Sequence, residues 1–276
     1  MYEDFYYRLE DTDAYLRRIG MDPAEFRPDK EHLDSLLLHH HQHVPFDNID
    51  VWDKAMLPDL GIPGLFDKIV NRKRGGYCFE LNGLLEAALK ALGYDCYSVE
   101  IKIVRGRDFM PPSRHRGVIV LLDGKKHFCD IGLGFTFFPE TTVFNEGYNE
   151  FGSKAVCKDG ICEIFLRQED GSDMRLLWFK DQPADPVEFV NPNFCCSQDP
   201  SSGFRTRLSM VIMTPEGLRE NLVCNAPAPK AGAKYSPEFT VTIKDRSKVV
   251  SEKTYCGTKA LEEILLKDFG VSYSFE

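Results

Sequence analysis

One cysteine lies at a position that favours chemistry. Cys78 follows Arg74-Gly-Gly-Tyr77 and precedes the clearest helical pattern in the chain. Backbone N–H groups and the helix dipole stabilise an anion at a helix N-terminus, which lowers the pKa of a thiol there. The two glycines also leave room for a second backbone or a ligand. A buried structural cysteine is the ordinary alternative for any one of the nine cysteines, and this setting favours a nucleophile instead.

A predicted hairpin supplies the partners that a thiolate nucleophile needs, an imidazole and an orienting carboxylate. Asp123-Gly124 between two apolar runs predicts a two-residue type I′ turn. That turn places Gly117 opposite Asp130, so His115 is the diagonal neighbour of Asp130 on the same face. His127 points to the other face. A slip of one residue would exchange the two histidines.

Together these residues predict a Cys78-His115-Asp130 triad. Asp130 would select the imidazole tautomer and stabilise the imidazolium, and His115 would hold Cys78 as a thiolate. Such a pair performs acyl transfer to water, an amine or a thiol. Taken singly, His115 could be a solvated loop histidine after Pro111-Pro112, and Asp130 a turn residue ahead of Gly132.

Metal binding is a weaker interpretation of the other candidate ligands. Cys157 and Cys162, or Cys195 and Cys196, lack a second half with zinc-finger spacing. The tract from His39 to His43 places two imidazoles on one helix face, but no HExxH pattern surrounds it. We expect no metal. Nine scattered cysteines fit a reducing compartment better than a disulfide framework.

Three segments with different patterns must position the triad. Residues 1–93 have helical periodicity, strongest after Cys78, and Gly93 is placed to end that helix. Residues 94–203 change to a period of two, with short strands to about Asn193. Residues 204–276 are mixed, with strands at 207–213 and 239–244 and an amphipathic helix through Leu261. This order predicts an α+β chain of three domains with those boundaries.

Composition excludes several classes of partner. The 276 residues carry a net charge of −9 and are 43% hydrophobic, with no dense Lys/Arg block. We therefore expect neither nucleic acid nor an anionic membrane as a partner. The apolar runs are too short to span a membrane, and the acidic N-terminus does not resemble a signal peptide. These features predict a cytoplasmic protein; no pattern indicates its oligomeric state.

Three motifs together resemble the arylamine N-acetyltransferases: Arg74-Gly-Gly-Tyr-Cys-Phe-Glu-Leu-Asn82, Val44-Pro-Phe-Asp-Asn48 and Asp130-Ile-Gly-Leu-Gly134. Tyr15-Leu-Arg-Arg-Ile-Gly20 and Pro200-Ser-Ser-Gly-Phe204 extend the similarity over nearly the whole chain. The resemblance implies a three-domain α+β cysteine acyltransferase fold: a helical bundle carrying the nucleophile, a β-barrel-like middle domain and a C-terminal α/β lid. It also implies a papain-like Cys-His-Asp arrangement.

The same resemblance implies ping-pong transfer of an acetyl group from acetyl-CoA, a co-substrate, to an aromatic amine or hydrazine through an acetyl-cysteine. No permanently bound cofactor is implied. The triad corresponds to Cys78, His115 and Asp130. The implied substrate-binding and CoA-binding residues are Phe46, Gly132, Leu133, Gly134, Phe135 and Phe204.

Some assignments stay open at this level. Arg74 and Glu80 are expected to form a charged pair that braces the loop before Cys78. A thiol hydrolase or a transglutaminase-like enzyme would use the same triad, and another acyl-CoA could serve as donor. A non-catalytic ligand-binding or scaffold protein is the alternative from a different class.

Overall fold

The computed structural model describes residues 2–226 and 236–275. The helices are α1 (Thr12–Arg18), α2 (Lys30–His43), α3 (Ile49–Lys54), α4 (Ile62–Phe66), α5 (Cys78–Ala91), α6 (Val190–Gln198), α7 (Gly203–Thr206) and α8 (Thr258–Phe269), with shorter turns at η1 (Glu3–Tyr6), η2 (Asp67–Asn71) and η3 (Pro186–Phe189). The strands are β1 (Phe46–Asp47), β2 (Asp95–Ile103), β3 (His115–Leu122), β4 (Lys125–Cys129), β5 (Thr142–Val143), β6 (Ser153–Lys158), β7 (Ile161–Arg167), β8 (Asp173–Lys180), β9 (Leu208–Met213), β10 (Arg219–Cys224), β11 (Glu238–Asp245) and β12 (Lys248–Cys256).

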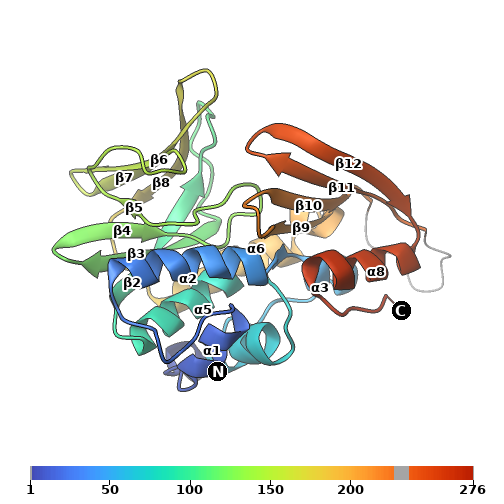
Figure 1. The fold of residues 1–276 in the computed structure, drawn as a ribbon, viewed down its shortest axis with the longest axis horizontal. Helices are drawn as coiled ribbons and strands as arrows, with labels where there is room; N and C mark the ends of the chain where they lie inside the picture. Colours follow the sequence, from blue (N-terminus) through green and yellow to red (C-terminus); the bar gives the residue numbers. More distant parts are fainter. Residues whose placement is uncertain (1, 227–235, 276) are drawn as a thin grey trace.

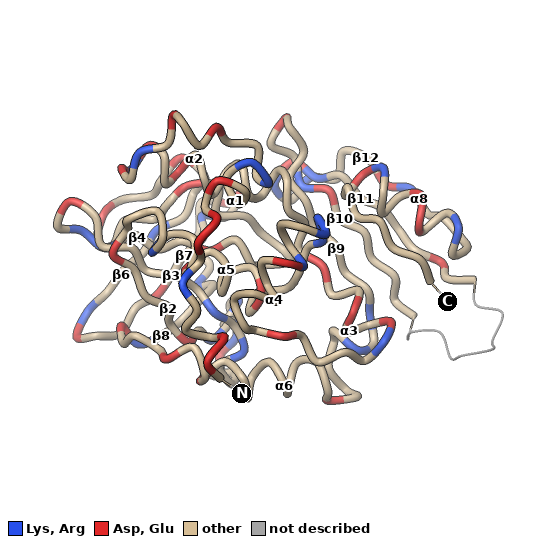
Figure 2. The backbone as a smooth tube through the Cα atoms, turned by 90° about the horizontal axis from the view of Figure 1, so that it is seen from below, with Lys and Arg blue, Asp and Glu red and all other residues tan. Residues whose placement is uncertain are grey.

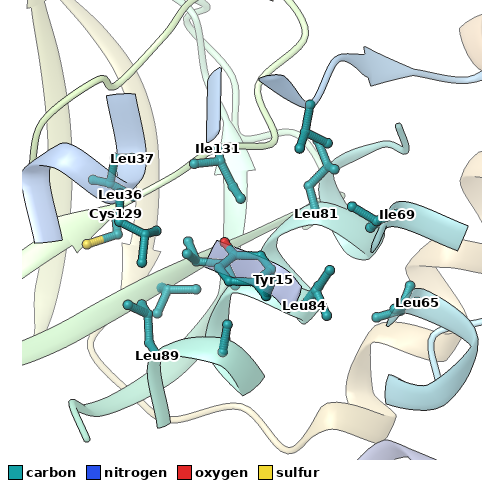
Figure 3. Packing of buried hydrophobic residues seen from close by; sticks show 14 of the residues in the cluster. Tyr15, Leu36, Leu37, Leu65, Ile69, Leu81, Leu84, Leu89, Cys129 and Ile131 are labelled. Carbon is teal, nitrogen blue, oxygen red and sulfur yellow. The ribbon is translucent and has the colours of Figure 1, made fainter. Parts of the chain in front are cut away.

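Helix α5 forms the centre of the helical part, as its sequence predicts. The Tyr77 N–H donates to Glu80 Oε2 (3.0 Å), which satisfies a backbone donor at the start of the helix. The helix ends ahead of Gly93, which has a φ of 99°. Its apolar stripe packs into a cluster with Tyr15 of α1 and leucines of α2, as Figure 3 shows. Burial of that stripe anchors the residue that begins the helix.

The predicted hairpin is confirmed as β3 and β4. Val120 pairs with His127, which is the register that the two-residue turn requires. Asp123 and Gly124 have φ values of 51° and 73°, as a type I′ turn demands. The hairpin belongs to an antiparallel sheet in the order β5-β4-β3-β2-β8-β7-β6.

A second sheet, β1-β9-β10-β11-β12, stands beside the first one, and both lie over the helices (Figure 1). Strands β9 and β11 and helix α8 confirm the elements predicted in the last segment. Strands β10 and β12 were not predicted. Strand β1, from the N-terminal segment, pairs with β9 of the last segment and so connects these two segments through one sheet.

The prediction of strands up to Asn193 is wrong at its end, because residues 190–198 form helix α6. Here the Asn193 side chain donates to the carbonyl oxygen of Pro58 (2.9 Å), and the Tyr77 hydroxyl donates to Asn193 Oδ1. These contacts bridge more than 100 residues of chain, so no local periodicity reports them.

In the described part of the chain, no helix is long and apolar enough to cross a membrane.

Candidate active site

Cys78 lies at the floor of a cavity, where α5 begins. The residue is 3% exposed, and its Sγ is 3.9 Å from the carbonyl oxygen of Arg114, the residue just before β3. A Cβ atom on Gly132 would lie 2.6 Å from the Cys78 Cα. Only glycine therefore allows this loop to approach the start of α5, and that approach brings the hairpin to the cysteine.

His115 and Asp130 form the contact that the hairpin geometry predicts. The distance from His115 Nε2 to Asp130 Oδ2 is 2.6 Å, and both side chains are buried. His127 lies on the other face, where its Nδ1 is 3.2 Å from Thr141 Oγ1. Because Asp130 occupies Nε2, Nδ1 is the ring nitrogen left to accept a proton from a neighbour. The catalytic roles of these residues stay predictions.

One cavity of about 300 Å³ brings together residues from all three segments of the sequence. Cys78 and His115 line it. So do all the residues that the resemblance assigns to substrate and CoA binding: Phe46, Gly132, Leu133, Gly134, Phe135 and Phe204. Asp130 is fully buried behind His115.

The electrostatics of Cys78 differ from the expectation at a helix start. Burial raises the pKa of the Cys78 thiol well above its ordinary value, and negative charge on Cys196 or Asp130 acts in the same direction. The backbone N–H groups of Arg116 and Phe79 favour the thiolate, but their effect is smaller. The pKa of the thiol is therefore shifted in the opposite direction to the one that the helix start predicts, and a thiolate at Cys78 would need a partner that takes the proton.

Asn82 connects the nucleophile helix to the carboxylate, a role that the sequence analysis missed. Its Nδ2 donates to Asp130 Oδ1 (2.9 Å), and its Oδ1 accepts from the Ile131 N–H (3.0 Å). The Gly132 N–H also donates to Asp130 Oδ1 (2.9 Å). The available signal was its spacing, because a residue four positions after Cys78 lies on the same helix face.

The expected pair between Arg74 and Glu80 is wrong, since each binds another partner. Lys68 Nζ lies 2.7 Å from Glu80 Oε1 and 2.8 Å from Asp50 Oδ2. Arg74 NH2 lies 3.0 Å from Asp50 Oδ1. Asp50 contacts both cations, and the cation beside Glu80 is Lys68 instead of the expected Arg74. The network still braces the segment before Cys78.

Several residues that could have been metal ligands have structural contacts instead. His39 Nδ1 contacts the Ile19 carbonyl oxygen (3.1 Å), and His43 Nδ1 contacts the His39 carbonyl oxygen (2.8 Å). Cys157 and Cys162 pair across β6 and β7 and form a disulfide, so neither offers the thiolate that zinc requires. The other seven cysteines form no disulfide.

Comparison with known proteins identifies the family. The N-acetyltransferase family model matches residues 29–275. The chain is 35% identical over 211 residues to the arylamine N-acetyltransferase / N-hydroxyarylamine O-acetyltransferase of Salmonella typhimurium, covering 74% of this chain and 73% of that protein. It is 32% identical over 236 residues to human arylamine N-acetyltransferase 1, covering 75% and 79%. The chain belongs to the arylamine N-acetyltransferase family.

Solved structures agree with this assignment. The arylamine N-acetyltransferase from Salmonella typhimurium superposes with a TM-score of 0.81 at 24% identity, covering 96% of this chain and 92% of that one. The Mycobacterium marinum enzyme in complex with CoA has a TM-score of 0.79 at 22% identity, covering 95% and 93%. The predicted family and α+β fold are confirmed.

Proposed function

We propose that this chain is an acetyl-CoA-dependent arylamine N-acetyltransferase in which Cys78 is the nucleophile, His115 the general base and acid, and Asp130 the residue that orients the imidazole. The observation that carries the assignment is the short His115–Asp130 contact in the wall of the cavity that also holds Cys78. Family membership supports the reaction, and the geometry supports these residues for it.

In the first half-reaction the thiol proton of Cys78 moves to Nδ1 of His115. Burial opposes an isolated thiolate, whereas proton transfer to the ring creates an adjacent pair of opposite charges that Asp130 stabilises. The sulfur attacks the thioester carbonyl of acetyl-CoA. The new C–S bond forms first and leaves a negative charge on the carbonyl oxygen. The bond to the CoA sulfur then breaks, and the imidazolium gives its proton to the departing CoA thiolate.

In the second half-reaction an amine attacks the acetyl-cysteine and His115 accepts its proton. The C–S bond then breaks, the amide leaves, and Cys78 remains as a thiolate that takes the proton back from the imidazolium. The backbone N–H groups that face the sulfur, those of Arg116 and Phe79, are suited to stabilise the oxyanion in both steps. One such donor is worth about 3 to 4 kcal/mol in the transition state. The apolar walls, including Phe46 and Phe204, suit an aromatic acceptor and exclude water from the thioester.

The wider setting belongs to the same proposal. We assign the chain three domains (1–93, 94–203 and 204–276) and a cytoplasmic location, which the seven cysteines outside the Cys157–Cys162 disulfide favour. Lys/Arg and Asp/Glu residues alternate along the described chain without a continuous basic band (Figure 2). That distribution supports small-molecule partners, acetyl-CoA and an arylamine, rather than nucleic acid or a membrane surface.

The test is the stoichiometry of the acyl-enzyme. Acetyl-CoA added without amine should produce one acetyl group per chain, found by peptide mass spectrometry on Cys78 and discharged by an aromatic amine. Cys78→Ala should carry no label. Cys196→Ser is the matched control, because Cys196 lines the same cavity and should not be needed. Absence of label in the native protein would overturn the proposal, and so would discharge to water at the same rate with and without amine, which identifies a hydrolase.

A further inference from the structure

Four arginines gather where the cavity opens. Arg105, Arg114 and Arg207 line it, and the Arg219 side chain reaches its edge by donating from NH1 to the carbonyl oxygen of Phe135. The Arg105 guanidinium stacks 4.5 Å from the centre of the Phe135 ring. Phe135 therefore contacts two guanidinium groups: that of Arg105, from the loop after β2, at its ring, and that of Arg219, from β10, at its carbonyl oxygen.

These cations lack the carboxylate partners that some other arginines of the chain have. Over residues 2–226 and 236–275, none of the four lies within 4.0 Å of a carboxylate oxygen; the negative charge of Asp199 acts on Arg114 only from farther away. By contrast, the buried Arg116 has Glu86 at 2.6 Å. The chain has 43 acidic residues, and none of those that the structure describes lies against this group.

Mutual repulsion makes the arrangement unfavourable without an anion. Burial lowers the pKa of the Arg219 guanidinium, and the positive charge of Arg105 lowers it further. Arg105 is exposed, whereas Arg219 is half-buried, so together they present one inner and one outer positive charge beside Phe135. An anion bound between them would relieve this repulsion, and guanidinium groups match the geometry of phosphate oxygens.

We propose that Arg105 and Arg219 bind the phosphate groups of the CoA donor at the mouth of the cavity, with Phe135 between them. This inference rests on the proposed function, because a CoA thioester that reacts at Cys78 must extend its phosphate-bearing end out of the cavity. Arg114 and Arg207 add positive potential along the wall. The arginines thus provide affinity for the donor, while the triad provides the chemistry.

The experiment compares two donors that differ in their phosphates. The rate constant for acetylation of Cys78, divided by the donor KM, is measured with acetyl-CoA and with S-acetylpantetheine, which has the same thioester and no phosphate. In Arg105→Gln the value for acetyl-CoA should fall about 10-fold to 100-fold, as loss of a charge-assisted hydrogen bond predicts. The value for S-acetylpantetheine should change less than about twofold.

Two further variants complete the design. Arg219→Lys keeps a positive charge but loses the planar guanidinium group. We therefore expect the acetylation rate constant divided by KM to fall about 3-fold to 10-fold with acetyl-CoA and not with S-acetylpantetheine. Arg107→Gln is the matched control, because Arg107 lies in the same loop as Arg105, its guanidinium donates to the Ile103 carbonyl oxygen, and it does not line the cavity. It should leave both donors unaffected.

The outcomes separate the two proposals. If the acetylation rate constant divided by KM fell equally for the two donors in Arg105→Gln and Arg219→Lys, the phosphate site would be overturned. The proposal of acetyl transfer would be unaffected. Unchanged donor kinetics with a raised KM for p-aminobenzoate, but not for aniline, would assign the arginines to an acidic acceptor instead. Failure of both donors to acetylate the native enzyme would refute the proposed function itself.

Discussion

Two groups of buried charges flank the first turn of α5, and they are built differently. On one side, Lys68, Glu80, Asp50 and Arg74 form a closed network in which each charge has an opposite partner within 3.0 Å. On the cavity side, Asp130 binds one nitrogen of the His115 imidazole, and the ring lines the same cavity as Cys78. The closed network can only stabilise its segment. The open pair can accept and return a proton.

The largest expected effect comes from changing the open pair. Asp130→Asn removes the charge that stabilises the imidazolium, so acetylation of Cys78 should slow by about 10⁴-fold, as for loss of the orienting carboxylate in other triads. Quenched-flow mass spectrometry measures this rate. The thermal midpoint should stay within a few degrees, since Asn can still accept from Asn82 and Gly132. Asp181→Asn, an acid paired with Lys126 away from the cavity, is the control. A near-native rate of acetylation in Asp130→Asn would mean that Asp130 is not the third member of the triad.

Breaking the closed network should change stability rather than chemistry. Lys68→Met leaves Glu80 without its closest cation, in a site where burial already raises the pKa of that carboxyl. We expect a loss of about 3 to 5 kcal/mol in the free energy of unfolding, measured in urea. Adding Glu80→Gln in the double variant should recover part of it. If the folded fraction of Lys68→Met acetylated Cys78 as slowly as Asp130→Asn does, the network would affect the chemistry as well. The distinction between a stabilising network and a reactive His115–Asp130 pair would then fail.

The smallest effect concerns Glu220 on β10, a half-buried carboxyl outside both groups. Burial raises its pKa from 4.5 to about 7, with Asp268 adding to the rise. The folded chain therefore holds this proton more tightly than the unfolded chain, so stability falls as pH rises from about 4.5 through about 7 and stays lower above that range. Glu220→Gln should stabilise the chain by about 1 kcal/mol at pH 8, allowing for solvent screening, and much less at pH 5. Equal effects at both pH values in urea unfolding would exclude a titration of Glu220.

Elements held by interactions between near neighbours could be predicted from the sequence, and those held by distant residues could not. The register of the hairpin was predictable, because a two-residue turn between Asp123 and Gly124 determines which face His115 and Asp130 share. Helix α5 was predictable from its own apolar period. Helix α6 was not, because Asn193 binds partners more than 100 residues away. The pair assigned to Arg74 and Glu80 failed for the same reason, since Asp50 and Lys68 come from other segments.

By itself the sequence determined the residues proposed for the triad, the hairpin that joins two of them, and the family. Tertiary structure alone decided the environment of Cys78: the Gly132 contact that closes the site, the burial that raises the thiol pKa, and the arginines at the cavity mouth. The reason is physical. Turn geometry and helical period act between near neighbours, whereas desolvation and the field of distant charges exist only once separate segments have packed together.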